Sequence, residues 1–168
     1  MIVFIKISKA DFLAVKDIVK SSFIGQEYDY LVSEVPYDWF GDSSTDWMMI
    51  LKNNNPCGFF LSRLVGNNYH LHSINVSGEY QGEGLGRKII EFHWKKGIKR
   101  NPYIDTYTLH VNQKNKSAIE FYKSLGYKKF NYGQAVQPES GLDNWVSNCQ
   151  KKDDWPLREG HILYYMQR

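Results

Sequence analysis

Cysteine is scarce in this sequence and long apolar runs are missing, and both absences narrow the class of protein. The 168 residues include only Cys57 and Cys149, and neither stands in a metal-ligand spacing. No apolar run approaches the roughly 18 residues that a membrane span needs. The start of the chain lacks a basic head followed by a long apolar core, so we expect no signal peptide. A reduced, cytoplasmic protein with no metal and no membrane partner is therefore expected.

Basic residues are missing from one long segment and concentrated in another. Residues 21–51 contain six acidic residues and no Lys, Arg or His, whereas residues 76–130 contain eleven Lys or Arg against five Asp or Glu. The first segment would attract cations and the second polyanions, although each is equally consistent with a solvated surface. No nucleic-acid motif accompanies the basic residues, so we expect no nucleic-acid partner.

Hydrophobic periodicity predicts one mixed α/β domain that spans residues 1–168. A first strand precedes a helix that begins with Ser8 and Asp11 in the pattern of a capping box. Three strands joined by short turns follow and should form an antiparallel meander. The second half is expected to contain a helix over 84–97, a strand over 105–111, a helix over 116–126 and strands over 127–133 and 160–168.

Helical spacing also predicts which side chains face the core. One more short helix is expected near residues 28–34, within an irregular, aromatic and acidic segment, which makes about four helices. Residues 137–160 have no clear period. The inward side chains should be Phe12, Val15, Ile18 and Val19 in the first helix, and Leu85, Ile89, Phe92 and Ile98 in the helix over 84–97.

Three glycines, Gly82, Gly84 and Gly86, occupy alternate positions where a strand gives way to a helix. Such a junction presents free backbone N–H groups at the positive end of the helix dipole, and glycine lets a phosphate approach them. The stretch QGEGLGRK therefore predicts a diphosphate site. Its spacing fits neither a Walker A loop nor a GxGxxG dinucleotide motif. A glycine-rich turn without a ligand remains the alternative.

The order Gln81-x-x-Gly84-x-Gly86 resembles the Q/R-x-x-G-x-G/A signature of the GNAT acetyltransferase superfamily, where it binds the pyrophosphate of acetyl-coenzyme A. The resemblance covers roughly residues 47–130. Many members have proline where Gly78 stands, and we expect glycine there to loosen the link. A second stretch resembles another family signature through Asn115, Ala118, Phe121, Tyr122, Leu125, Gly126 and Tyr127.

The resemblance implies the GNAT fold, an α/β (α+β) architecture with a mixed, mostly antiparallel central sheet flanked by about four helices. In this fold the strand before the signature bulges and is splayed from the next strand at the cofactor site. The implied cosubstrate is acetyl-CoA, with the Ile74 N–H polarising the thioester carbonyl. Arg87, Lys88 and Lys123 are candidates for phosphate contacts, with plain surface charge as the alternative. The implied cofactor-binding residues are Ile74, Asn75, Val76, Gln81, Gly82, Glu83, Gly84, Leu85, Gly86, Arg87, Asn115 and Tyr122.

The implied reaction, direct attack of an amine on the thioester, needs a base, an acid and a donor for the oxyanion. Tyr122 matches the position of the family's acid, although a packed aromatic is the alternative. His70 and His72 share a strand face, and an imidazole pKa near 6.5 would allow either to accept a proton. The stretch HLHSINV resembles the arylalkylamine (serotonin) N-acetyltransferases, where a His-x-His pair lies in the amine channel. A purely structural role remains possible for both.

The acceptor is predicted to be a small-molecule primary amine, bound under the segment 21–46, whose acids and aromatics suit an organic cation. An enzyme that acetylates a lysine or N-terminus of a protein is the first alternative. A non-catalytic acyl-CoA-binding module is the second. Residues 137–168 supply the last strand, and their first part either closes the site or forms a homodimer interface. The acceptor's identity and the acyl length stay open.

Overall fold

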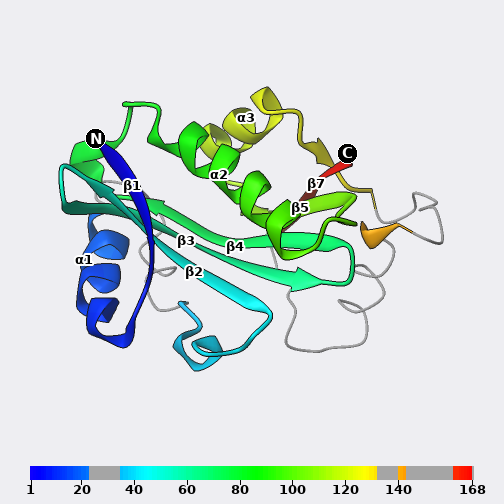
Figure 1. The fold of residues 1–168 in the computed structure, drawn as a ribbon. Coiled ribbons are helices and arrows are strands. Elements are labelled where there is room, and N and C mark those ends of the chain that lie inside the picture. Colours follow the sequence, from blue (N-terminus) through cyan, green and yellow to red (C-terminus); the bar gives the residue numbers. More distant parts are fainter. Residues whose placement is uncertain (23–34, 132–139, 143–160, 168) are drawn as a thin grey trace. The chain divides into compact units, whose positions relative to one another are not determined.

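A mixed α/β fold is confirmed in the computed structural model, which describes residues 1–22, 35–131, 140–142 and 161–167 (Figure 1). Three α-helices lie within these residues, and the short helix expected near 28–34 lies outside them. The elements, with η for 3-10 helices, are β1 (Ile2–Lys6), η1 (Lys9–Asp11), α1 (Phe12–Ser22), η3 (Tyr37–Trp39), β2 (Thr45–Lys52), β3 (Asn55–Val65), β4 (Asn68–Val76), η4 (Gly78–Tyr80), α2 (Leu85–Arg100), β5 (Thr106–Asn112), α3 (Lys116–Ser124), β6 (Lys128–Lys129) and β7 (His161–Gln167).

The strands form one sheet in the order β1-β2-β3-β4-β5-β7-β6. The β1–β2, β2–β3, β5–β7 and β6–β7 pairs are antiparallel, and β4 pairs with β5 in parallel. The mostly antiparallel sheet is therefore confirmed, as is the order of strands predicted for the meander. The register of β4 with β5 runs only from Asn68 to Leu71, although β4 continues to Val76.

The chain divides into two compact units, each made of two stretches of sequence. The first unit is Met1–Arg63 with His72–Lys95, and the second is Leu64–Leu71 with Lys96–Arg168. β4 therefore belongs to the second unit up to Leu71 and to the first from His72 onward.

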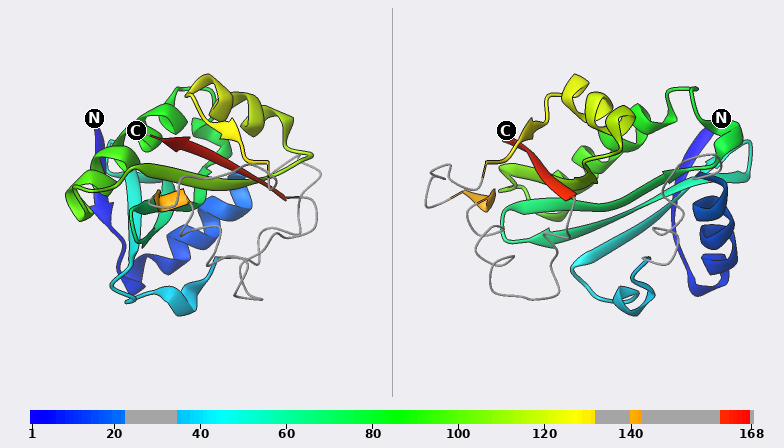
Figure 2. Two further views of the ribbon diagram at one scale, coloured as in Figure 1. Left: turned by 90° about the vertical axis from the view of Figure 1, so that its right-hand side faces the viewer. Right: turned by 180° about the vertical axis from the view of Figure 1, so that it is seen from behind.

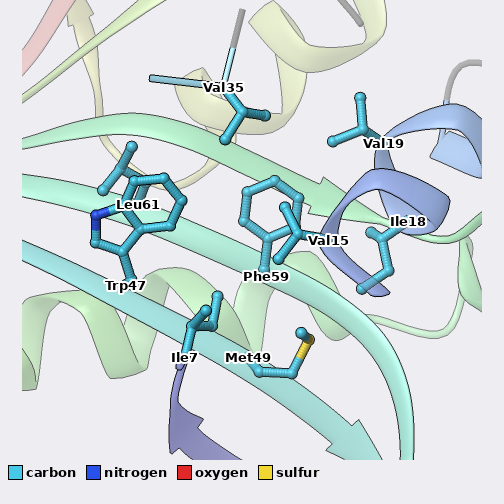
Figure 3. Packing of buried hydrophobic residues seen from close by; sticks show 9 residues of the cluster. All are labelled: Ile7, Val15, Ile18, Val19, Val35, Trp47, Met49, Phe59 and Leu61. Atoms are coloured by element: carbon cyan, nitrogen blue, oxygen red, sulfur yellow. The ribbon is translucent and has the colours of Figure 1, made fainter. Parts of the chain in front are cut away.

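The first unit has a core between α1 and one face of its strands. Ser8 begins the helical stretch as predicted, because its N–H and its hydroxyl each donate to the Asp11 carboxylate at 2.7 Å. The predicted inward face of α1 is also confirmed. Figure 3 shows side chains of this helix meeting those of β2 and β3 in one apolar cluster. Its buried members are Ile7, Val15, Ile18, Val19, Val35, Trp47, Met49, Phe59 and Leu61.

The other face of the same strands is covered by α2, so that the two helices lie on opposite sides of β1–β3 (Figure 1; Figure 2). Phe92 of α2 stacks on Phe4 with ring centroids 4.1 Å apart. The Nδ1 atom of His93 lies 2.8 Å from the Ser62 hydroxyl, and both residues are fully buried. Phe60 and Ser62 thus face α2, and their neighbours in β3 face α1, as strand alternation requires.

The last turn of α2 belongs to the second unit and differs from the prediction. Ile98, expected to face the core, is 48% exposed, and Gly97 is buried instead. A Cβ atom at Gly97 would lie 2.8 Å from Cδ1 of Tyr69 and 3.1 Å from Cε1 of Tyr107. Only glycine lets the helix backbone lie this close to the two rings.

The last predicted strand is confirmed, and the strand predicted before it is shorter in the structure. β7 occupies nearly the whole of the predicted stretch 160–168, whereas β6 is reduced to Lys128–Lys129 within the predicted 127–133. A small apolar cluster in this unit joins β7 to the chain that follows β6. Its buried members are Phe130, Leu142, Leu163 and Tyr165.

Because His93 is buried, we expect the free energy of unfolding to decrease in mild acid. Burial lowers the pKa of His93 to about 3, whereas the same side chain in the unfolded chain keeps a pKa near 6.5. At a pH between these two pKa values, only the unfolded chain takes up the proton. The contribution of neutral His93 to the free energy of unfolding is therefore complete above pH 6.5 and shrinks as the pH falls. Replacing the residue (His93→Gln) should reduce the loss of unfolding free energy between about pH 7 and about pH 5 by about 2 kcal/mol. Urea unfolding at both pH values measures this difference, and equal losses in the two proteins would contradict the prediction.

Candidate active site

The glycine run at the start of α2 has a backbone conformation that glycine adopts readily. Gly82 and Gly84 have φ angles of +82° and +76°, in the left-handed region that side chains other than glycine rarely adopt. A Cβ atom at either position would meet no other atom within 4 Å. Residues 81–84 are exposed. The glycines are therefore needed for the path of the backbone, and the space around them is open to a ligand.

This path leaves a row of amide donors unused. Among the described residues, no acceptor takes the backbone N–H groups of residues 82–87, and the first bond of the helix joins the Lys88 N–H to the Gly84 carbonyl at 3.4 Å. Such donors at a helix start carry partial positive charge and bind anions. The segment from Gly82 to Arg87 therefore fits the diphosphate that its sequence predicts.

Gln81, the first residue of the signature, is used to hold the loop in place. Its Nε2 atom donates to the carbonyl of Ser22 at 3.1 Å and to that of Val76 at 2.9 Å. The side chain thus ties the loop to the end of α1 and to the end of β4. The Gly78 N–H donates to the Ser21 hydroxyl at 2.9 Å, a bond that proline could not make. The Gly78 N–H therefore anchors the link to α1, and the loosening that we expected from glycine at this position stays a prediction.

The pleat of β4 is irregular just before the loop. The Asn75 side chain accepts a bond from the Ser22 hydroxyl at 3.0 Å, on the side of the sheet that α1 covers. The ring of His72 meets Trp39 edge-on at 4.8 Å, and Trp39 packs against the same α1-side core. Residues three apart would face opposite sides of a regular strand. The strand therefore has an irregularity around Ile74, at the place where the resemblance implies a bulge.

His72 differs from the near-neutral base that we expected. Burial, together with the positive charge of Arg63, lowers the pKa of His72 to about 4. Its Nδ1 atom lies 2.9 Å from the Ser73 hydroxyl, and Arg63 lies over the Trp39 ring at 5.0 Å. The imidazole is thus uncharged at neutral pH and is available as a hydrogen-bond acceptor.

His70 belongs to the second unit, where it is part of a buried polar network. Its Nδ1 atom lies 2.9 Å from the Thr108 hydroxyl, and its ring meets His110 edge-on at 5.3 Å. The amide of Asn68 also donates to Thr108, at 2.8 Å. These contacts give His70 a structural role, and its catalytic role stays a prediction.

In the same unit, α3 positions Asn115 and Tyr122, the two residues of the second signature that are predicted to bind the cofactor. The Asn115 side-chain oxygen accepts from the Ala118 N–H at 3.1 Å and caps the helix, which leaves its NH2 group for other partners. The Tyr122 ring is buried between Phe121 and Tyr127. Burial, and secondarily Tyr127, raise the pKa of Tyr122 well above 10. The phenol is therefore protonated at neutral pH, and no described residue forms a hydrogen bond with its hydroxyl.

Comparison with known proteins identifies the family. The sequence model of the acetyltransferase (GNAT) family matches residues 12–127. The chain belongs to this family. The peptidyl-lysine N-acetyltransferase YjaB of Salmonella typhimurium is 26% identical over 106 residues, 63% of this chain and 65% of that protein. The thialysine N-epsilon-acetyltransferase of Sus scrofa is 35% identical over 68 residues, 40% of this chain and 39% of that protein.

The GNAT fold extends over the whole chain, although the curated relatives match less than two thirds of their own length. The PaiA N-acetyltransferase of Thermoplasma acidophilum, solved in complex with coenzyme A, superposes with a TM-score of 0.69. The superposition covers 100% of this chain and 99% of the other, at 14% identity, and therefore supports the fold alone. The narrower resemblance of the histidine pair to the serotonin N-acetyltransferases stays a prediction.

Among the basic candidates of this GNAT chain, Arg87 and Lys88 are exposed on the first turn of α2, and Lys123 pairs with Glu120 at 3.1 Å. Sequence analysis missed another basic residue at the loop, Lys52, which forms an ion pair with Glu83 inside the loop. This hydrogen bond raises the pKa of Lys52. The two residues are 31 positions apart in different elements, so no local sequence signal could have indicated the pair.

The described ranges of this GNAT chain hold neither a candidate metal site nor a candidate membrane span. Those residues contain no group of three or more His, Cys, Asp or Glu side chains that could hold a metal ion. They also contain no helix that is both long and apolar enough to cross a membrane.

Proposed function

We propose that this protein is an acetyl-CoA-dependent N-acetyltransferase that acetylates a primary amine of a small molecule by direct attack in a ternary complex. The observation that supports this most is the row of unused amide N–H groups over residues 82–87, which Gly82 and Gly84 hold in the open. These donors suit the diphosphate of coenzyme A. Acetyl-CoA supplies the activated acyl group as a thioester.

The first unit would bind the cosubstrate through its backbone. The amides of residues 82–87 hold the diphosphate, and the backbone groups of Ile74 and Val76 bond the pantetheine. The irregular pleat around Ile74 supports this role, because a bulge frees backbone groups from the strand pairing. The Ile74 N–H would donate to the carbonyl oxygen as negative charge develops on it.

Tyr122 would stabilise the leaving thiolate as a hydrogen-bond donor. Tyr122 is protonated at neutral pH because burial raises the pKa of its phenol. A thiol with a pKa near 8.5 is the stronger acid, so complete transfer of the phenol's proton to a thiolate is unfavourable. Tyr122 therefore acts by donating a hydrogen bond to the sulfur while the bond to the acyl carbon breaks. The free NH2 group of Asn115 would bond the pantetheine.

His72 is too weak a base to deprotonate an ammonium ion by itself. An alkylamine has a pKa near 10.4 and His72 one of about 4, so this transfer would cost about 9 kcal/mol. The amine would instead lose its proton to the solvent. His72 would accept a hydrogen bond from the neutral amine and orient its lone pair. His70 stays a candidate to assist from its buried network.

A protein or peptide acceptor is the second candidate, and the likeness to a peptidyl-lysine N-acetyltransferase favours it. The small-molecule acceptor is supported by the likeness to a thialysine N-epsilon-acetyltransferase. A non-catalytic acyl-CoA-binding module is the third candidate, and Tyr122 and the histidines speak against it, because a pure binding module has no need of them.

An acceptor screen distinguishes these functions. The full chain is incubated with acetyl-CoA and with aromatic amines, polyamines, free amino acids, lysine-containing peptides or peptides with a free N-terminus. We expect thiol release and a gain of one acetyl group with one of the small amines. Turnover with peptides alone would show that the acceptor is a protein or peptide, which is the second candidate function. Bound coenzyme A with no turnover of any acceptor would favour the binding module.

The cofactor site is tested by a glycine substitution with a matched control. Alanine at position 84 (Gly84→Ala) strains a left-handed residue by about 1 kcal/mol and turns the amides out of line. We expect coenzyme A to bind at least about tenfold more weakly, as measured by calorimetry, because hydrogen bonds to a charged group are lost.

Gly41 serves as the control, because its φ angle is +95°, it is exposed, and a Cβ atom there meets nothing within 4 Å. Gly41→Ala should therefore lower stability to a similar extent and leave coenzyme A binding unchanged. Equal binding by both variants would contradict the assignment of the loop.

Removing the phenol hydroxyl tests the hydrogen bond that we assign to Tyr122. We expect Tyr122→Phe to lower kcat about 100-fold and to leave coenzyme A affinity within about threefold, because the hydroxyl acts only as the thiolate forms. Tyr127→Phe, which removes a hydroxyl from the neighbouring buried ring, should leave kcat nearly unchanged. A kcat for Tyr122→Phe equal to that of the wild type would assign this tyrosine to packing.

A further inference from the structure

An acidic side chain stands in the middle of the anion-binding loop. Glu83 lies between the two left-handed glycines, inside the row of six unused amide groups. A carboxylate there repels a diphosphate, because like charges at short range destabilise each other. The loop thus contains an electrostatic conflict that its glycines and amides do not resolve.

Lys52 stands where it can remove that conflict. It is the last residue of β2, and its ammonium group forms a hydrogen-bonded ion pair with the Glu83 carboxylate. The same ammonium group lies 5.2 Å from the centre of the Tyr80 ring, in η4 just before the loop. Lys52 therefore makes two contacts with the segment that carries the amides, and all three residues belong to the first unit.

This ion pair contributes little to the stability of the whole protein. The Lys52 and Glu83 side chains are 30% and 42% exposed, and solvent screens such pairs strongly. Its effect is therefore local, on the charge of the loop and on the orientation of the residue between Gly82 and Gly84.

We propose that Lys52 is a positioning residue for the cofactor loop: its ammonium group neutralises Glu83 and keeps that carboxylate away from the amides, so that a diphosphate can bind. The inference rests on the proposed function, since it takes the loop as the site of the coenzyme A diphosphate. Lys52 stays with Glu83 when the cofactor binds and makes no phosphate contact of its own.

A double-mutant cycle tests the inference by calorimetry of coenzyme A binding to the full chain. Lys52→Met should weaken binding about five- to tenfold in about 50 mM salt and much less in about 500 mM salt, because screening removes the repulsion from Glu83. Glu83→Gln should bind at least as tightly as the wild type. In the Glu83→Gln background, Lys52→Met should change the affinity by less than about twofold.

Two controls separate this role from other effects of a lost lysine. Lys16 also lies over a tyrosine ring, 5.8 Å from the centre of Tyr37, and Lys16→Met should leave coenzyme A binding unchanged. Dephospho-coenzyme A keeps the diphosphate and lacks the 3′-phosphate, so the loss caused by Lys52→Met should be the same with it.

Four results would overturn the inference. Unchanged binding by Lys52→Met would show that Glu83 needs no partner. A loss that persists in the Glu83→Gln background would make Lys52 a direct phosphate ligand. A loss that disappears with dephospho-coenzyme A would assign Lys52 to the 3′-phosphate, and an equal loss in Lys16→Met would indicate net charge alone. A wild-type protein that binds no coenzyme A at all would refute the proposed function as well, which distinguishes the two failures.

Discussion

The site depends on one constraint, the left-handed backbone at Gly82 and Gly84 that keeps the first amides of α2 free of protein acceptors. This arrangement is unstable by itself, because unpaired donors and a glycine-rich turn favour many conformations. The structure holds it from two sides. Gln81 bonds to the ends of α1 and β4, and Gly78 bonds to Ser21, so the turn is tied to α1 and to β4.

Desolvation sets the chemical character of the candidate catalytic groups in each unit. It raises the pKa of Tyr122 and lowers the pKa of His72, so that both side chains are uncharged at neutral pH. A phenol that keeps its proton can donate, and an imidazole without one can accept. Neither group is suited to a complete proton transfer with an amine or a thiol, and both are suited to orienting hydrogen bonds. Solvent is then the main route for the proton that the amine loses.

Local signals in the sequence predicted the fold well where a few neighbouring residues decide the structure. The capping box at Ser8 and Asp11 and the apolar face of α1 are of this kind. The prediction was wrong at Ile98, because the helical pattern of the sequence does not show which side chains of other elements pack against the last turn of α2. Tyr69 and Tyr107 approach the last turn of α2 so closely that glycine, and not isoleucine, has to face them.

The sequence by itself determined the family, the strand–turn–helix that carries the signature, and the residues able to donate to an anion, because each depends on residues close together in the chain. Only the tertiary structure decided what those residues contact. The bond from Gln81 to the Ser22 carbonyl, the burial that lowers the pKa of His72 and the pairing of Lys52 with Glu83 arise from groups far apart in sequence. Burial and charge act through space, and spacing along the chain carries no record of them.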